Sequence, residues 1–337
     1  MSKARISWKQ QPKHWIFAVA FFMIPVLHLI GVSTVQAQGG AYPSQPVRVI
    51  VGFPPGGGVD VVARLLGQKL DSLLGQPMIV ENRPGAASGI GTRAVTGAEP
   101  DGYTVLINSN SMVVNQVTNP HAGYDIERQL IPIINVAWQS TIIVAKPDLA
   151  ASSLRDVLAL SRKSKISYGT PGIGSVLHLA GTYLFNMLAK TDILHVPYKG
   201  AAPALSATAG SQIDLAFVTL PPAIPLVKSA KVKAVAVTSP KRSPSLPNTP
   251  TVAESGYPGY EVRVFTGYFM PAGTPKAVGD RFRDAVLKVL AMPDVKEKLA
   301  SLGFEQADTS KENFPRLVSD EIRQWTKVAK EANIKIE

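Results

Sequence analysis

Three turns rich in small, uncharged residues are the places where this sequence could hold a ligand. They span Pro55–Gly58, Asn108–Ser111 and Thr170–Ser175. Each follows a short apolar run typical of a buried strand and precedes apolar residues at helical spacing, so we expect three strand-to-helix junctions. In an open α/β sheet, ligands bind outside the carboxyl ends of the strands, which is where such junctions lie.

The chemistry that these turns favour is the capture of an anion by neutral donors. No ionised side chain occurs at their tips. Glycine lets the backbone approach a ligand, and the first amides of a helix have no intrahelical acceptor. A helix start favours an anion by about 0.3–1 kcal/mol, so two facing turns would clamp a carboxylate without an arginine. Each turn alone is equally an ordinary bend, but the three together indicate a binding site.

The candidate ligand-binding residues come from these turns, from a residue just before the first one, from a further glycine-rich turn over residues 84–91 and from the first turn of the helix after residue 175. They are Phe53, Pro55, Gly56, Gly57, Gly58, Ser88, Ser109, Asn110, Thr170, Gly174, Ser175 and His178. His178 has two open roles, a hydrogen bond to the bound carboxylate or packing against and capping its own turn. We expect His195 to be structural, and Asp60 with Arg64 to form an ordinary i,i+4 ion pair.

Catalytic, metal and nucleotide motifs do not match this chain. The lack of cysteine excludes disulfides, thiolate metal sites, a cysteine nucleophile and a lipid-anchored N-terminus. After residue 37 the only histidines are His121, His178 and His195, and their spacing is not that of a metal site. Residues 56–58 lack the lysine of a P-loop, and the G-x-G-x-x-A match at residues 89–94 lacks an acidic ribose partner about 20 residues on. We expect a binding protein, not an enzyme, with no catalytic residue, cofactor or metal.

Length and composition predict a compact protein with two lobes. A chain of 337 residues exceeds the usual size of one hydrophobic core. Hydrophobic residues make up 45% and charged residues 18%, and the formal net charge is +11. A basic surface attracts anions. No run of lysine and arginine is dense enough to predict a nucleic-acid groove, so nucleic acid is not an expected partner.

The N-terminal segment has the three-part layout of a signal peptide. A basic stretch reaches Lys13, an apolar stretch runs from Trp15 to Ile30, and small residues precede a cleavage point after Ala37. An uncleaved anchor helix is the alternative, which Pro25 and the short apolar run disfavour. Residues 1–37 are therefore predicted to be a signal peptide that directs the rest of the chain out of the cytoplasm.

Strands and helices alternate along the rest of the chain, which predicts an α/β fold with doubly wound sheets. The expected strands span residues 47–51, 78–81, 103–107, 142–144, 166–168, 194–196, 215–217, 232–237 and 262–270. The expected helices span residues 59–74, 154–161 and 176–188, with one more after residue 91 and a helical remainder after residue 270. Thr309 and Glu312 have capping-box spacing at the start of the last helix. We expect lobe I to comprise residues 42–144 and 262–337, and lobe II residues 145–261.

Several motifs resemble those of the Bug-type solute receptors of tripartite tricarboxylate transporters. They are FPPGGGVD at residues 53–60, VENRPGA at 80–86, PDGYT at 100–104, HVPYKG at 195–200, PTVAE at 250–254 and PAGTP at 271–275. They occur in order over the whole chain after the leader. The resemblance implies a periplasmic receptor with the two-lobed type II periplasmic-binding-protein fold. It also implies delivery of a carboxylate, held partly through waters, to a permease with a large and a small integral membrane subunit.

The resemblance adds two site residues and narrows the expected ligand. Phe217 and Thr219 lie where members of the family carry a strand phenylalanine followed by Asp-Asn, but here Val218 replaces the acidic residue. Thr182 stands where glutamate is common. Without an acidic partner for an amino group, we expect a non-aminated mono- or dicarboxylate, with an aromatic one as an option because of Phe53 and Phe217. We expect a monomer.

Two other functions stay open at this point. The receptor could present its bound form to a membrane sensor kinase instead of a permease, and the sequence does not separate the two. A hydrolase or isomerase acting on a carboxylate would need a nucleophile and a base, and Ser175 with His178 is the one candidate pair. The sequence does not name the carboxylate.

Overall fold

The computed structural model describes residues 42–309, 313–331 and 334. The signal peptide predicted over residues 1–37 lies outside the described residues, as does Glu312 of the predicted capping pair.

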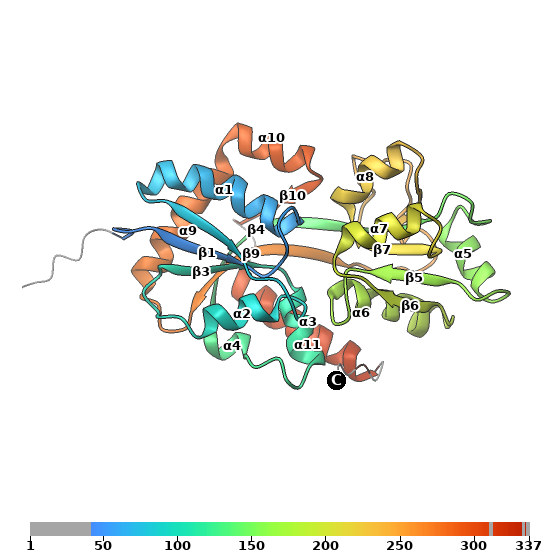
Figure 1. Ribbon diagram of the computed structural model, residues 1–337, viewed down its shortest axis with the longest axis horizontal. Coiled ribbons are helices and arrows are strands. Elements are labelled where there is room, and N and C mark those ends of the chain that lie inside the picture. Colours follow the sequence, from blue (N-terminus) through green and yellow to red (C-terminus); the bar gives the residue numbers. More distant parts are fainter. Residues whose placement is uncertain (1–41, 310–312, 332–333, 335–337) are drawn as a thin grey trace, which may run out of the picture. The chain divides into compact units, whose positions relative to one another are not determined.

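The first sheet is built around three parallel strands (Figure 1). Strand β1 (Val47–Val51) pairs with β2 (Met78–Asn82) on one side and with β3 (Thr104–Asn108) on the other. Two antiparallel strands extend it, β9 (Arg263–Pro271) beside β3 and then β4 (Leu130–Ala145). A short strand, β10 (Phe304–Gln306), pairs with the other edge of β4.

Helices cover both faces of this sheet because its strands are apolar on both faces. Val47, Val49 and Val51 pack into one core, whereas Ile50 packs into another. The first core includes α1 (Gly58–Leu74), α9 (Lys276–Ala291) and α10 (Pro293–Ser301). The second includes α2 (Gly89–Thr96), α3 (Ser111–Thr118), α4 (Ile126–Gln129) and α11 (Phe314–Glu331). This two-sided burial is what parallel strands require.

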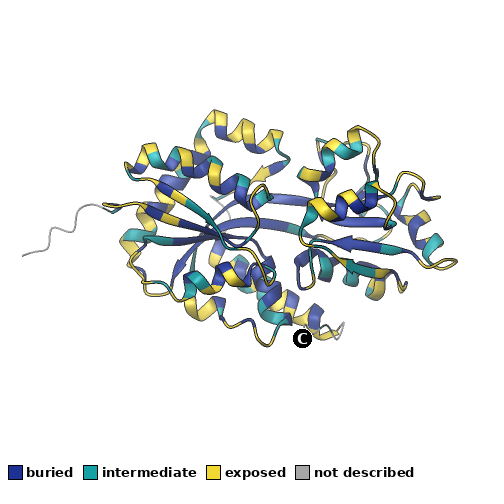
Figure 2. Cartoon of the chain, in the orientation of Figure 1, coloured by how far each residue is buried: buried dark blue, intermediate teal, exposed yellow. Residues whose placement is uncertain are grey.

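The second sheet repeats the arrangement. Strand β5 (Ser167–Thr170) lies parallel between β6 (Leu194–Pro197) and β7 (Leu215–Thr219), while β4 pairs antiparallel with β7 and with β8 (Lys233–Val237). Its helical segments are α5 (Leu154–Ser161), α6 (Val176–Thr182), η1 (Tyr183–Leu188), α7 (Ala201–Ala209) and α8 (Leu220–Lys228). The helices and strands alternate as predicted. Figure 2 shows the central strands buried along most of their length, whereas the edge strands β2 and β6 are partly exposed.

Strand β4 belongs to both sheets. Its 16 residues pair with β9 from Leu130 to Ser140 and then with β7 and β8 from Thr141 onward. Figure 1 shows β4 and β9 running side by side between the two sheets. The sequence predicted only residues 142–144 of this strand, because the polar residues Asn135 and Gln139–Thr141 interrupt the apolar pattern.

Two predictions about the elements need correction. The remainder after residue 270 is not wholly helical, because β10 buries Phe304 and fills the edge of β4. The helix predicted over residues 176–188 changes to the wider π form at Tyr183. There the buried Tyr260 hydroxyl donates to the Ala180 carbonyl (2.8 Å), which competes with the ordinary helical bond. The last helix begins at Phe314, where Asn313 Oδ1 accepts the Arg316 amide (3.1 Å).

Helix α11 is seated on β9 through a glycine. A Cβ atom added to Gly267 would overlap the ring of Phe314 and would lie 3.1 Å from the Ile134 carbonyl oxygen. Phe314 itself packs edge-on against Phe265, with ring centroids 5.3 Å apart. The missing side chain at Gly267 therefore makes room for the first residue of α11.

We predict that Gly267→Ala lowers the free energy of unfolding by about 1–3 kcal/mol, the usual cost of overpacking a core. Urea denaturation measures it, and Phe314→Leu in the same chain should recover part of the loss. Gly279→Ala in α9 is the matched control, because its Cβ would make only an ordinary contact, 3.4 Å from Ile133 Cδ1. Equal stabilities of Gly267→Ala and Gly279→Ala would contradict this packing.

Candidate functional site

The first turn joins β1 to α1 and is braced by a buried carboxylate. Asp60, only 2% exposed, accepts hydrogen bonds from the Gly56 amide (2.9 Å), Asn82 Nδ2 (2.8 Å) and Arg64 Nε (3.1 Å). Burial alone would raise the pKa of Asp60, but these hydrogen bonds outweigh it and hold the pKa below its ordinary value. The predicted pair of Asp60 with Arg64 is present, and it is one part of a network that fixes the turn.

The amides that this turn can offer to an anion come from the start of α1 and not from its tip. The Gly56 amide is taken by Asp60, and the Gly57 amide donates to the Pro54 carbonyl (3.3 Å). The first intrahelical bond runs from Val61 to the Gly57 carbonyl (2.9 Å), so the amides of residues 58–60 have no intrahelical acceptor. Gly58 opens this donor group.

The turn over residues 84–91 closes onto the end of β1. A Cβ atom on Gly52 would lie 2.7 Å from Ser88 Cβ, and one on Gly91 would lie 2.8 Å from Gly52 Cα, so both positions need glycine. Ser88 has a positive φ of 73° and is 2% exposed. Its Oγ has no hydrogen-bond partner in the described part of the chain. The Ser88 hydroxyl, next to Gly52, is therefore a buried donor that is unpaired among the described residues.

The turn after β3 is held both by hydrogen bonding within the turn and by hydrogen bonds to residues far away in the sequence. Ser109 Oγ accepts the Ser111 amide (3.2 Å), and Asn110 Nδ2 donates to the Arg263 carbonyl (3.0 Å) and to Glu321 Oε2 (3.1 Å). Burial raises the pKa of Glu321, although the bonds from Trp325 and Asn110 oppose it. The amide nitrogen of Asn110 thus ties β9 and α11 to the end of β3, which leaves only its buried Oδ1 without a partner among the described residues.

Gln139 is a buried polar residue beside the first turn that the sequence analysis missed. It lies in β4 between Val264 of β9 and Phe304 of β10, and it is 2% exposed. Its carboxamide occupies the space where Gly58 would carry a side chain, since a Cβ there would overlap Nε2 and lie 3.0 Å from Oε1. Its one signal in the sequence is a polar residue within an apolar stretch, and that stretch was not predicted as a strand.

The second-sheet turn over Thr170–Ser175 is closed by internal hydrogen bonds. Ser175 Oγ donates to the Gly172 carbonyl (2.8 Å) and accepts the His178 amide (3.2 Å), while the Gly174 amide donates to His178 Nδ1 (3.3 Å). His178 therefore caps its own turn, which is one of its two predicted roles. The structure brings Thr170, Gly174, Ser175 and His178 together as predicted.

His195 is also part of this cluster. Its Nε2 lies 2.7 Å from Thr170 Oγ1, and its ring stacks on that of His178 with centroids 4.1 Å apart. Burial lowers the pKa of His178 to about 4. Burial, and then the neighbouring His178, lower the pKa of His195 to about 3. Both rings are neutral at pH 7, which lets them stack without repulsion.

The remaining candidates lie in different surroundings. Phe53 is half-buried against the first core, and Pro55 and Gly56 are exposed at the tip of the turn. Thr219 ends β7 opposite Thr141 and is half-buried. Phe217 is fully buried in the core, so in this structure its ring has no surface open to a ligand.

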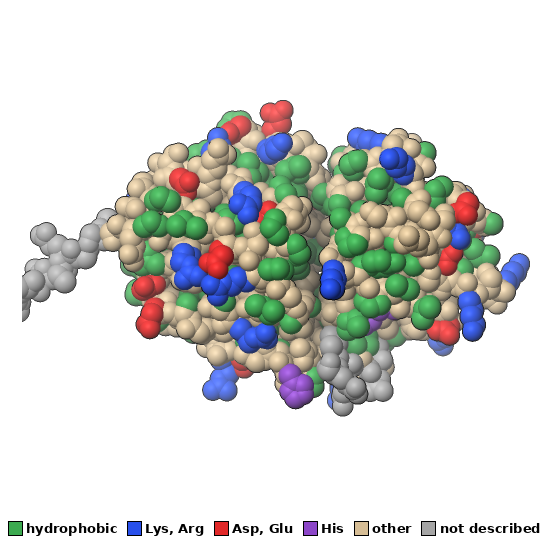
Figure 3. Space-filling model, viewed as in Figure 1, with side chains coloured by type: hydrophobic (Ala, Val, Ile, Leu, Met, Phe, Trp, Pro, Cys, Tyr) green, Lys and Arg blue, Asp and Glu red, His purple; other side chains and the backbone are tan. Residues whose placement is uncertain are grey.

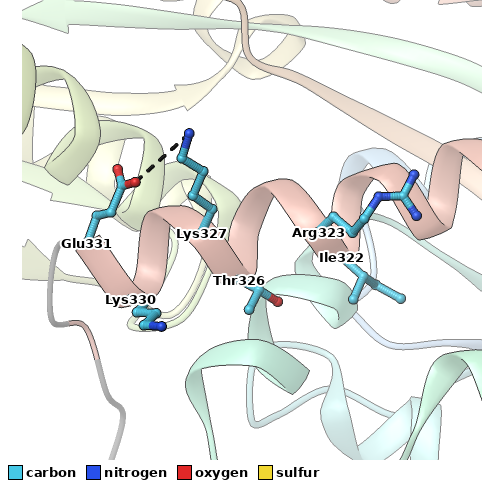
Figure 4. A pocket seen from close by; sticks show the side chains of 6 residues that line it. All are labelled: Ile322, Arg323, Thr326, Lys327, Lys330 and Glu331. Carbon is cyan, nitrogen blue, oxygen red and sulfur yellow. Dashed lines mark ion pairs between the residues drawn. The ribbon is translucent and has the colours of Figure 1, made fainter.

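Other kinds of site find no support in the described residues. Within residues 42–309, 313–331 and 334, no group of acidic or histidine side chains could hold a metal ion. In the same part of the chain, no helix has the length and apolar character needed to cross a membrane. A surface hollow on α11 is lined by Ile322, Arg323, Thr326, Lys327, Lys330 and Glu331 (Figure 4), and it includes none of the candidate residues. On the face shown in Figure 3, basic side chains are interspersed with acidic ones.

A comparison with known families decides the class of this protein. Residues 62–334 match the receptors of the tripartite tricarboxylate transporter family. The chain belongs to this family. Protein BugT of Bordetella pertussis is 31% identical to this receptor over 324 residues, which cover 93% of the receptor and 99% of BugT.

Three solved structures are similar to this receptor. The periplasmic binding protein BugD is 35% identical, with a TM-score of 0.79, over 88% of this chain and 100% of BugD. A protein of R. palustris solved with adipate is 32% identical, with a TM-score of 0.81, over 87% and 99% of the two chains. MatC of Rhodopseudomonas palustris, with bound malate, is 29% identical, with a TM-score of 0.79, over 85% and 99%.

These similarities confirm the predicted family and the periplasmic-binding-protein fold. The receptor is a solute-binding protein of a family whose members are periplasmic binding proteins rather than enzymes.

We predict that Asp60→Asn lowers the free energy of unfolding by about 1–3 kcal/mol, because the Gly56 amide, Asn82 and Arg64 lose a charged acceptor. Chemical denaturation of both proteins measures the difference. Asp284→Asn, on the exposed side of α9, is the matched control and should change stability by less than about 0.5 kcal/mol. If the two variants were equally stable, Asp60 would not brace the turn.

The stacked histidines predict a loss of stability in acid. The unfolded chain takes up protons near pH 6.5, whereas the folded rings take them up only near pH 4 and 3. The free energy of unfolding should therefore fall as pH decreases from about 6.5 to those values. In His195→Gln this fall should be shallower, and in His121→Gln, an exposed control, it should be unchanged. NMR titration of the ring protons checks the folded pKa values, and midpoints near 6.5 would refute the explanation.

Proposed function

We propose that this receptor is exported to the periplasm, captures a small organic carboxylate there and delivers it to a tripartite tricarboxylate-type permease. The observation that carries the proposal is the presence of unpaired neutral donors in the segments that follow β1 and β2. The start of α1 offers amides without intrahelical acceptors. Ser88 Oγ, which belongs to the turn that packs on Gly52 directly after β1, is buried without a partner among the described residues. A helix start favours an anion without a cationic side chain.

The ligand class that we propose is a non-aminated mono- or dicarboxylate. Two similar proteins were solved with adipate and with malate, both of which are dicarboxylates without an amino group. Val218, which takes the place of an acidic residue common in the family, is fully buried and apolar. It therefore offers no counter-charge to an ammonium group, and burying an unpaired charge is costly.

We further propose that the ligand is held between lobe I, residues 42–144 and 262–337, and lobe II, residues 145–261. Lobe I would contribute the α1 start, Ser88 and the turn at Ser109, and lobe II the turn at Thr170–Ser175. The sharing of β4 between the two sheets supports this division, because β4 and β9 are then the natural hinge. We propose that the receptor acts as a monomer after removal of residues 1–37.

The proposal is tested by screening carboxylates against the protein that starts after Ala37. A ligand present at about 100 times its dissociation constant adds about 2.7 kcal/mol to the free energy of unfolding. A thermal-shift screen with adipate, malate, succinate and benzoate, and with aspartate as the aminated comparison, should show stabilisation by at least one non-aminated compound. No stabilisation by any carboxylate, or stabilisation by aspartate alone, would count against the ligand class.

We predict that Gly57→Val weakens binding of the best carboxylate far more than Ser175→Ala does. Gly57 has an ordinary φ of −71° and an added Cβ would approach only the Pro54 carbonyl oxygen (3.3 Å), so the fold should accept valine. The valine would nevertheless fill space beside the α1 start. Ser175→Ala removes a helix cap that costs stability but supplies at most one neutral hydrogen bond to a ligand, about 0.5–1.5 kcal/mol. Calorimetry on both variants decides it, and parental affinity in Gly57→Val would place the site elsewhere.

A further inference from the structure

The carboxamide of Gln139 is a buried donor without a partner. The side chain comes from a strand that is paired on both sides, and it is 2% exposed. Among the described residues, Nε2 has no hydrogen-bond partner. Buried polar groups in folded proteins are nearly always hydrogen-bonded, so an unpaired amide in this place calls for an explanation.

The direction of this carboxamide gives the explanation. It lies against Gly58, the first residue of the 17-residue helix α1, and it occupies the space of the missing Gly58 side chain. Gly58 also begins the group of amides without intrahelical acceptors. The unpaired Nε2 and the helix start are therefore next to each other, and both are neutral hydrogen-bond donors.

We infer that Gln139 is a specificity-determining residue of the binding site, whose Nε2 donates a hydrogen bond to the carboxylate that the start of α1 attracts. This inference rests on the proposed function. A carboxylate has two oxygens and several lone pairs, so it can accept from the helix amides and from Nε2 together. The bond to Nε2 would satisfy the buried donor that is unpaired without a ligand.

Because this donor is uncharged, it can be distinguished experimentally from a charged group at the same position. An amide binds the ionised carboxylate without gaining or losing a proton. A glutamate in its place would have nearly the same shape but would repel the ligand unless one of the two groups took up a proton. Replacing glutamine by glutamate at residue 139 therefore tests whether this side chain contacts the ligand or only fills space.

The test uses the chain after Ala37, with adipate and malate as probes together with the best compound of the carboxylate screen. Gln139→Leu removes the donor and should weaken binding about 10- to 100-fold, as expected for one bond to a charged group. Gln139→Glu should weaken it further and should take up protons on binding at pH 7, whereas the parent protein takes up none. Calorimetry in buffers of different ionisation enthalpy measures this proton uptake.

Two controls keep the result clear. Gln212→Glu makes the same change of charge at an exposed position between α7 and β7 and should bind like the parent. The unfolding free energy of each ligand-free variant is measured beside its affinity. If Gln139→Leu is less stable but binds with parental affinity, Gln139 only supports the helix start and the inference is overturned. Parental affinity without proton uptake in Gln139→Glu overturns it as well.

The same experiments distinguish a failure of the proposed function from a failure of the inference about Gln139. If the parent protein binds no carboxylate in the screen, the proposed function is refuted and the inference is refuted with it. If the parent binds one and both Gln139 variants bind it equally well, only the inference is wrong.

Discussion

The pairing of β4 with partners in two sheets is the constraint on which the rest of this structure depends. Its first part is hydrogen-bonded to β9 and β10, and its last part to β7 and β8. At Thr141, β4 passes from the first sheet to the second, and we call this residue the crossing point. Thr238 fixes it, because its amide donates to the Thr141 carbonyl (3.0 Å) and its hydroxyl donates to the Val262 carbonyl (2.7 Å). The strand that leaves the first sheet is thus tied to the segment that returns to it.

This constraint also positions the candidate site. Gln139 lies two residues before the crossing point, and the first turn packs against it at Gly58. A side chain at residue 58 would displace the carboxamide, and a shift of β4 by one residue would turn that carboxamide to the opposite face of the sheet. The third glycine of the first turn is therefore a steric requirement set by a strand far away in the sequence.

Most hydrogen bonds around the turns at residues 55–58 and 170–175 are made by uncharged groups. Asp60 is the exception, and its charge is directed inward to the Gly56 amide, Asn82 and Arg64 instead of to the ligand side. In the second-sheet turn, His178 and His195 are buried far enough to be uncharged at pH 7. A carboxylate bound as we propose would therefore meet oriented dipoles and not a cationic side chain.

The sequence by itself determined the α/β class, the family and the three turns, because these depend on local signals. Apolar runs, glycines and helical spacing are properties of neighbouring residues, so Gly56–Gly58 and Thr170–Ser175 could be recognised without a structure. Only the tertiary structure decided which polar groups meet. The pairing of β4 brings Gln139 against Gly58, and the pairing of β5 with β6 brings His195 to Thr170. The packing of α11 brings Glu321 to Asn110, which lies 211 residues earlier in the chain. Contacts at such separations follow from the register of strands and the packing of helices, which no local pattern encodes.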